Sequence, residues 1–176
     1  MKHLKKLLAL AVAIALLAPA LCWPALADSI SPALMKRATE IIVEMECSGN
    51  YGCVTNDSNS SPSVGLFQWN AAQGVSLLKK IIDQDKAEAR EILGDSLYNE
   101  LNGGSSSVWN KRVLSKDEKT RVGNLLKTSA GRKIQDEMVE TYISSYIRSG
   151  MAVGITDPNA LAYYADMLNQ VGSGAI

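Results

Sequence analysis

Apolar side chains recur at helical spacing through most of the chain. A first helix is predicted from Pro32 to about Cys47, with Ser31-Pro32 as N-cap and first position and Ser48-Gly49-Asn50 as its end. The apolar positions that support it follow steps of three and four residues: Leu34, Ala38, Ile41, Ile42 and Met45. Similar patterns predict helices over residues 71–83, 86–93, 116–127, 130–148 and 158–171.

The segment from Asn50 to Ser63 differs, because it is rich in Asn, Ser, Asp and Gly. Loops of this length inside a compact domain tend to be functional. Alternating patterns typical of strands are nearly absent elsewhere. We therefore predict an all-α fold with at most a small β-hairpin in the 50–64 loop.

Residues 1–27 have the pattern of a signal peptide for the Sec route. Three lysines precede an apolar run from Leu7 to Leu21, and Ala25-Leu26-Ala27 supplies small residues for cleavage. The alternative, a retained anchor, is disfavoured because a membrane helix needs about 20 apolar residues. Cleavage would leave one domain over 28–176, free of the membrane and either secreted or associated with the cell wall.

Charge and residue usage exclude several function classes. Residues 28–176 hold 15 basic and 18 acidic side chains, a net charge of −3, and no basic block. We expect no nucleic-acid partner, and we expect a monomer. The only histidine, His3, lies in the signal segment, so Ser-His-Asp and Cys-His catalysis and the common zinc sites are excluded from the mature chain. We expect neither a metal nor a cofactor.

Two cysteines remain after cleavage, Cys47 and Cys53. Export favours a disulfide between them, across five residues that include Gly and Asn. Two reduced thiols are the alternative.

Two glutamates break the usual charge pattern of a helix. Glu44 and Glu46 lie in the last turn of the first helix, where the negative end of the helix disfavours an anion. They are either solvated side chains or include a carboxylic acid kept protonated to donate a proton. Glu46 is the better candidate for a general acid, because the turn Ser48 to Tyr51, where a substrate could approach, follows it directly.

The motifs around this acid resemble those of lysozyme-like peptidoglycan hydrolases and lytic transglycosylases. The resemblance lies in Glu46-Cys47-Ser48-Gly49-Asn50-Tyr51, then Asn56-Asp57, then Ser63-Val64-Gly65-Leu66-Phe67-Gln68-Trp69. The segment Tyr163 to Gln170 also resembles the late tyrosine-bearing helix of small Gram-positive and phage members. One departure is Cys47, which stands between glutamate and serine where many relatives have them adjacent.

This resemblance implies a mostly helical fold in two lobes around a cleft. It implies an enzyme that cleaves the β-1,4 bond between N-acetylmuramic acid and N-acetylglucosamine in peptidoglycan glycan strands, with Glu46 as the general acid. Ser63 and Gln68 would line the cleft, and Gly65 would let backbone come close. Tyr164 would place a hydroxyl near the acid.

Sugar-binding chemistry points to an overlapping set of residues. Sugar rings have apolar faces and hydroxyl rims, so a cleft needs aromatic side chains and amides. Tyr51, Trp69, Asn56 and Gln68 supply both within one short segment. For Trp69, packing in the core is an equally good reading.

A second carboxylate would distinguish the possible mechanisms. Asp57 is the candidate base or charge stabiliser, and its alternative role is an Asx turn. Asp166 could serve instead, or could be a structural cap partner. If neither serves, the one-acid mechanism of lytic transglycosylases is preferred over that of a muramidase. A lysozyme-like protein that only binds glycan or a protein partner is the alternative to an enzyme.

Overall fold

A computed structural model describes residues 29–56 and 61–171 of the 176-residue chain. The predicted signal peptide and Asp57 lie outside these residues, so the predictions made for them are neither confirmed nor contradicted. The chain divides into two units, Met1–Ser31 and Pro32–Ile176, and every helix and strand described here belongs to the second. Within the described ranges, no helix is long and apolar enough to cross a membrane.

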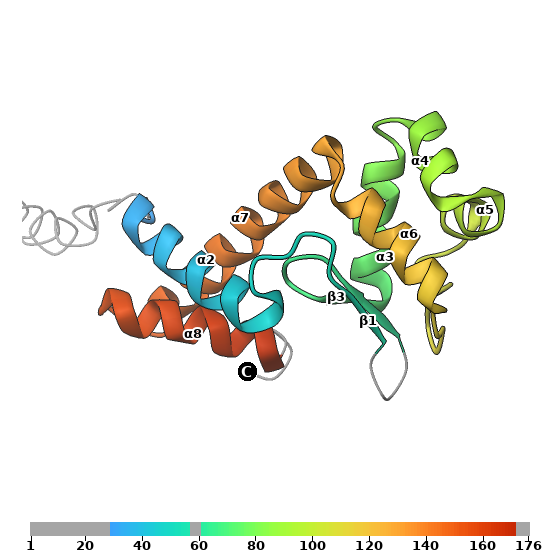
Figure 1. The fold of residues 1–176 in the computed structure, drawn as a ribbon. Helices are drawn as coiled ribbons and strands as arrows, with labels where there is room; N and C mark the ends of the chain where they lie inside the picture. The colour runs from blue at the N-terminus through green and yellow to red at the C-terminus, as the bar shows by residue number, and fades with distance from the viewer. Residues whose placement is uncertain (1–28, 57–60, 172–176) are drawn as a thin grey trace, which may run out of the picture. The chain divides into compact units, whose positions relative to one another are not determined.

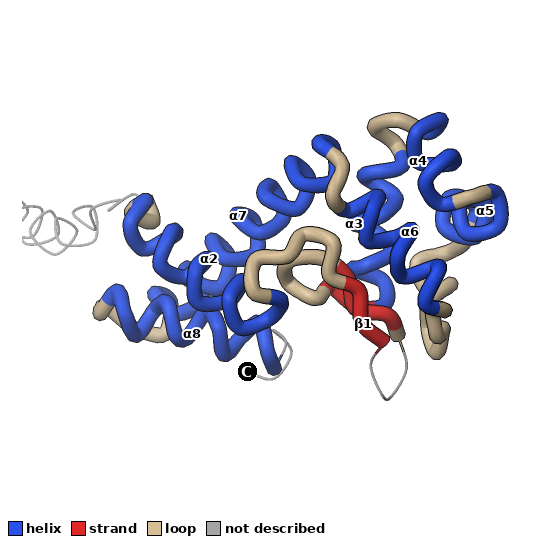
Figure 2. The backbone as a smooth tube through the Cα atoms, viewed as in Figure 1, coloured by secondary structure: helices blue, strands red, loops and turns tan. Residues whose placement is uncertain are grey.

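The described residues of this unit form seven helices and three short strands (Figures 1 and 2). The helices are α2 (Pro32–Cys47), α3 (Ala71–Ile82), α4 (Lys86–Leu93), α5 (Asp95–Gly103), α6 (Lys116–Leu126), α7 (Ser129–Ala152) and α8 (Pro158–Val171). The strands are β1 (Val54–Asn56), β2 (Pro62–Val64) and β3 (Trp69–Asn70). The prediction of a helical protein with a small β element is confirmed, whereas α5 and β3 were not predicted.

Helix α2 packs against α8 and α7, as Figure 1 shows. Small buried residues line the contact, with Ala38 on α2 and Ala162 and Ala165 on α8 all fully buried. A β-carbon at Gly150 of α7 would lie 2.7 Å from the Leu161 side chain of α8, so a larger residue there would require that side chain to shift. The end of α2, where Glu46 lies, is therefore held against the last helix of the chain.

The remaining helices form a second core around α3 and α6. Leu77, Leu78, Ile81 and Ile82 of α3 are buried, as are Leu125 and Leu126 of α6. The predicted capping box is present at the start of α6, where Ser115 and Glu118 bond to each other's backbone amides. Helix α3 also packs on α7 and on the strands, which places the sheet next to both groups of helices.

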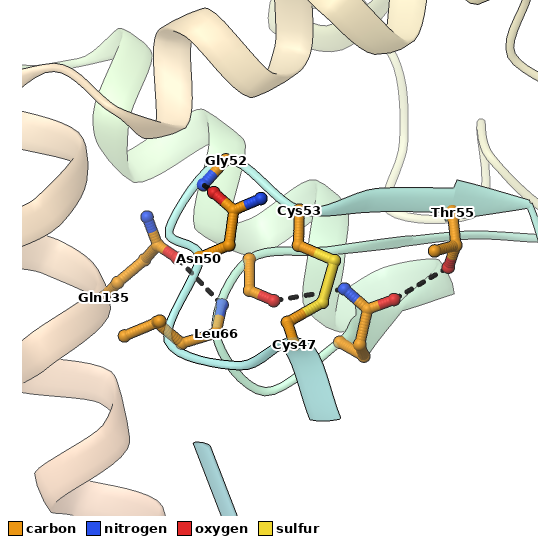
Figure 3. The surroundings of a disulfide bond; sticks show 9 residues. Cys47, Asn50, Gly52, Cys53, Thr55, Leu66 and Gln135 are labelled. Carbon is orange, nitrogen blue, oxygen red and sulfur yellow. Dashed lines mark hydrogen bonds between the residues drawn. A yellow bond between two sulfur atoms is a disulfide. The ribbon is translucent and has the colours of Figure 1, made fainter. Parts of the chain in front are cut away.

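The sheet is antiparallel throughout, with the order β1-β2-β3. Val54 pairs with Val64, and Val64 pairs with Trp69 on its other side. Cys47 and Cys53 form a disulfide, which confirms the bridge predicted between them (Figure 3). The bridge fastens the end of α2 to the start of β1.

Candidate functional site

Glu46 and Glu44 have different surroundings, although both lie in the last turn of α2. Glu44 is exposed, whereas Glu46 is half-buried against α8. The Nδ2 of Asn169 donates a hydrogen bond of 2.8 Å to Oε1 of Glu46. Only Glu46 therefore has the partly dry and oriented environment that a proton donor needs.

The pKa of Glu46 is raised above its ordinary value. Burial is the largest cause, because it disfavours the charged form, and the negative charge of Asp166 acts in the same direction. The hydrogen bond from Asn169 acts in the opposite direction. Near neutral pH a larger fraction of Glu46 is thus protonated than of an exposed glutamate, as general acid catalysis requires.

An open pocket of about 550 Å³ includes Asn169, the hydrogen-bond partner of Glu46, in its lining, whereas Glu46 itself is not a lining residue. One side of it comes from the β3 region, with Phe67, Gln68, Trp69 and Asn70, and another from α7 and α8. Four aromatic rings follow one another along it, with centroids 5.4 Å apart for Phe67–Trp69, 6.3 Å for Trp69–Tyr142 and 6.1 Å for Tyr142–Tyr146. Aromatic rings mixed with amide side chains suit a sugar ligand.

Trp69 lines this pocket but is almost entirely buried. Its side chain is only 3% exposed, in agreement with the core-packing alternative. Its Nε1 is nevertheless buried without a hydrogen-bond partner among the described residues. Ser63, also predicted to line the cleft, is buried in β2.

Gly65 does allow a close approach, but to a side chain of its own chain. Its φ is 75°, and a β-carbon there would lie 2.5 Å from Oε1 of Gln135. That oxygen accepts a hydrogen bond of 3.0 Å from the amide of Leu66 (Figure 3). Gln135 is fully buried on α7, so this contact holds the 65–68 turn in place.

Gln68 lines the pocket while its amide is held by the protein. Oε1 accepts a hydrogen bond of 2.7 Å from Thr55, and Nε2 donates one of 3.1 Å to the carbonyl of Gly65. The backbone of Gln68 has a positive φ of 49°, a conformation uncommon outside glycine. One Nε2 hydrogen remains for a ligand.

Two predicted tyrosines make contacts within the protein. The hydroxyl of Tyr51 donates to Asp136 of α7 at 2.7 Å, which raises the pKa of Tyr51, and the guanidinium of Arg132 lies 5.2 Å from its ring centre. The ring of Tyr164 packs on Gly150, and its hydroxyl is buried without a hydrogen-bond partner in the described structure. That hydroxyl therefore makes no hydrogen bond to Glu46.

The structure adds Asn169, which the sequence did not assign to the acid, and brings the alternative carboxylate Asp166 near it. Asn169 bonds to Glu46, and Asp166 is close enough to affect its pKa. Gln170 donates a hydrogen bond of 3.1 Å to Asp166. Asn169 and Gln170 follow Asp166 by three and four positions on α8, so the three side chains lie on one side of the helix. This polar stripe on the last helix was visible in the sequence, but its partner helix was not.

Comparison with known proteins provides no further assignment. No family model matches the chain, and no significant match was found to a curated protein or to a solved structure. Across residues 29–56 and 61–171, no group of three or more His, Cys, Asp or Glu side chains is placed to hold a metal.

Proposed function

We propose that this protein cleaves peptidoglycan glycan strands at the β-1,4 bond between N-acetylmuramic acid and N-acetylglucosamine, with Glu46 as the general acid. The observation that carries the proposal is the environment of Glu46. It is half-buried, has a raised pKa and is hydrogen-bonded to Asn169, which lines a pocket of aromatic and amide side chains. The resemblance of the motifs around Glu46 to lysozyme-like hydrolases supports the choice of substrate.

In the proposed reaction, protonated Glu46 gives its proton to the oxygen that leaves the muramic acid carbon. Asn169 occupies Oε1 of Glu46 as a hydrogen-bond donor, so Oε2 is the oxygen available to carry the proton. Proton transfer and bond cleavage leave Glu46 as a carboxylate and positive charge on the sugar ring. The carboxylate is then in a position to stabilise that charge.

The reaction ends when either water or the 6-hydroxyl of the muramic acid itself bonds to the muramic acid carbon and gives its proton to a carboxylate. A muramidase needs a second carboxylate to position water, and the one that acts on Glu46 in the described residues is Asp166. Gln170 already engages one of its oxygens. A lytic transglycosylase needs Glu46 alone, so both chemistries are kept as alternative forms of the proposal.

The test is digestion of purified sacculi by the wild type, Glu46→Gln and Glu44→Gln. Glu46→Gln removes the transferable proton, and we expect the rate of clearing to fall by about 10²–10⁴. Glu44→Gln is the matched control, because it removes an exposed acid from the same helix turn and is expected to leave the rate near normal. Mass spectrometry of the products separates anhydro-muramyl ends from reducing ends, and thus transglycosylase from muramidase.

Full activity in a folded Glu46→Gln protein would contradict the catalytic role of Glu46. A wild type that binds sacculi but releases no muropeptide would contradict enzymatic cleavage and favour a glycan-binding protein. Thermal melts of all three proteins show whether any loss of activity reflects unfolding.

A further inference from the structure

A second concave surface lies between the disulfide loop and α6. We call it the α6 groove. It has a volume of about 300 Å³; Gly52 and Val54 line one side, and Lys116, Lys119, Asn124 and Lys127 line the other. Neither Glu46 nor any residue of the aromatic pocket belongs to it.

The lysines of the groove share one face of the helix. Lys116, Lys119 and Lys127, the last at the C-cap of α6, are separated by three and eight positions, which returns each to the same side. At 1.5 Å per residue, the first and last lie about 16 Å apart along the helix axis. The positive charges therefore form a line and not a single point.

A contact between two glycines shapes the floor of the groove. A β-carbon at Gly123 would lie 2.7 Å from the carbonyl oxygen of Gly52, and one at Gly52 would lie 2.8 Å from that of Gly123. The same β-carbon at Gly52 would lie 2.8 Å from Cε of Lys127. The two glycines thus let the disulfide loop lie directly on α6 and leave room for the stem of Lys127 across it.

The acids of α6 do not neutralise these lysines. Asp117 pairs with Arg121 at 2.7 Å, and Glu118 pairs with Arg112. Lys116, Lys119 and Lys127 have no carboxylate within ion-pair distance in the described parts of the chain, and all three line the groove. A fourth cation, Arg132, donates from Nε to the carbonyl of Lys127 at 3.1 Å. The groove is thus a concentration of positive charge on a chain whose net charge is zero overall.

We propose that the α6 groove binds a linear polymer of phosphate groups along the helix axis. Lysine binds phosphate as a point charge from any direction, so a line of three lysines can follow a row of phosphates. The two arginines that pair with acids of α6, Arg112 and Arg121, already hold carboxylates. The groove lining contains no aromatic ring on which a nucleobase would stack, so nucleic acid is not the expected ligand. This binding is independent of the cleavage proposed at Glu46.

The test is titration calorimetry of the purified protein with linear polyphosphate at low salt. Replacing Lys116, Lys119 and Lys127 together by Gln is expected to weaken binding about tenfold or more, since each lost ion pair removes Coulomb attraction to the polymer. The matched control replaces Lys36, Lys80 and Lys133 by Gln, which changes the net charge equally on α2, α3 and α7. The control triple is expected to bind within about threefold of the wild type, because remote surface charges are screened.

Three results would overturn the proposal: no measurable binding by the wild type, equal losses in the two triple variants, or equally tight binding of polyglutamate, which would remove the preference for phosphate. Equally tight binding of single-stranded DNA would overturn the expectation that nucleobases are not accommodated. Glu46→Gln is expected to bind polyphosphate like the wild type, so failure of this proposal and failure of the proposed catalysis are separate results. Thermal melts accompany each variant.

Discussion

The network around Arg112 and the surroundings of Glu46 both contain partly buried carboxylates. The two regions differ in how many of their polar atoms have hydrogen-bond partners. In the Arg112 network, Glu100 accepts hydrogen bonds from Arg112 and Trp109, both at 3.1 Å, and Glu118 is bound by Arg112 and by the amide of Ser115. Near the candidate site, three buried polar atoms have no hydrogen-bond partner among the described residues: Trp69 Nε1, Tyr164 Oη and Asp166 Oδ1.

The two regions also shift carboxylate pKa values in opposite directions, downward at Glu118 and upward at Glu46. The hydrogen bond from the Ser115 amide lowers the pKa of Glu118, with help from Arg112. Burial and Asp166 raise the pKa of Glu46. A network whose polar groups are all hydrogen-bonded stabilises the fold, whereas buried polar groups without partners reduce stability. Such groups indicate a site that serves function and not stability. We therefore expect substitutions in the first region to change stability and substitutions in the second to change activity.

The largest expected stability effect is that of Arg112→Ala. It leaves Glu100 and Glu118, whose side chains are only 23% and 26% exposed, without their shared cation. We expect a loss of about 2–3 kcal/mol, below the cost for a fully buried pair because solvent screens these groups partly. Chemical denaturation measures it. The control, Arg121→Ala, breaks an exposed pair with Asp117 and is expected to cost less than about 0.5 kcal/mol. Equal losses of unfolding free energy in the two variants would contradict the importance of the Arg112 network for stability.

Asp166→Asn tests the opposite behaviour at the candidate site. Losing the negative charge near Glu46 lowers the pKa of Glu46, so the alkaline limb of the activity profile is expected to move to lower pH. Stability at neutral pH is expected to stay within about 0.5 kcal/mol or to rise. The pH profile of sacculus clearing is the measurement. Asp83→Asn, an exposed acid after α3, serves as control, and an unshifted profile for Asp166→Asn would remove Asp166 from the site.

The smallest expected effects are changes in how stability depends on pH, and they have opposite signs at Glu46 and Glu118. The pKa of Glu46 is raised, so charging it costs stability as the pH rises through that pKa. The stability gain of Glu46→Gln is therefore expected to be absent at low pH and to grow above the ordinary value of 4.5. The pKa of Glu118 is lowered, so its stabilisation is present above 4.5 and is lost as the pH falls. Glu118→Gln is thus expected to cost most at neutral pH. Denaturation of the wild type and of both variants from pH 3 to 8 measures these free energies of unfolding. If each variant differs from the wild type by the same amount at every pH, both expectations are contradicted.

Much of the fold could be predicted from the sequence where local chemistry determines it. The start of α2 at Pro32, the Ser115–Glu118 capping box and the Cys47–Cys53 bridge depend on neighbours in the chain, and all three are present. The end of α8 at Val171 was predicted in the same way, whereas α7 extends four residues beyond the predicted Arg148.

Elements that depend on distant partners were not predicted. Helix α5 contains two asparagines and ends in glycine, so its helical propensity is low and the packing of Leu97, Tyr98 and Leu101 maintains it. Strand β3 is two residues long and is defined only by its pairing with β2. At the site, sequence position was sufficient to favour Glu46 over Glu44, but the contact with Asn169 depends on how α2 and α8 pack. The roles proposed for Asp57 and Tyr164 stay predictions.

The hydrogen bond between Glu46 and Asn169 joins residues 123 positions apart, whereas the disulfide beside Glu46 spans only six. Closing a contact at such long separation costs more chain entropy than closing a short loop. The ribosome makes α2 before α8. The environment that raises the pKa of Glu46 therefore cannot assemble until α8 has been made, and a product truncated before Asn169 lacks it. Only a chain that includes α8 holds Glu46 in this environment.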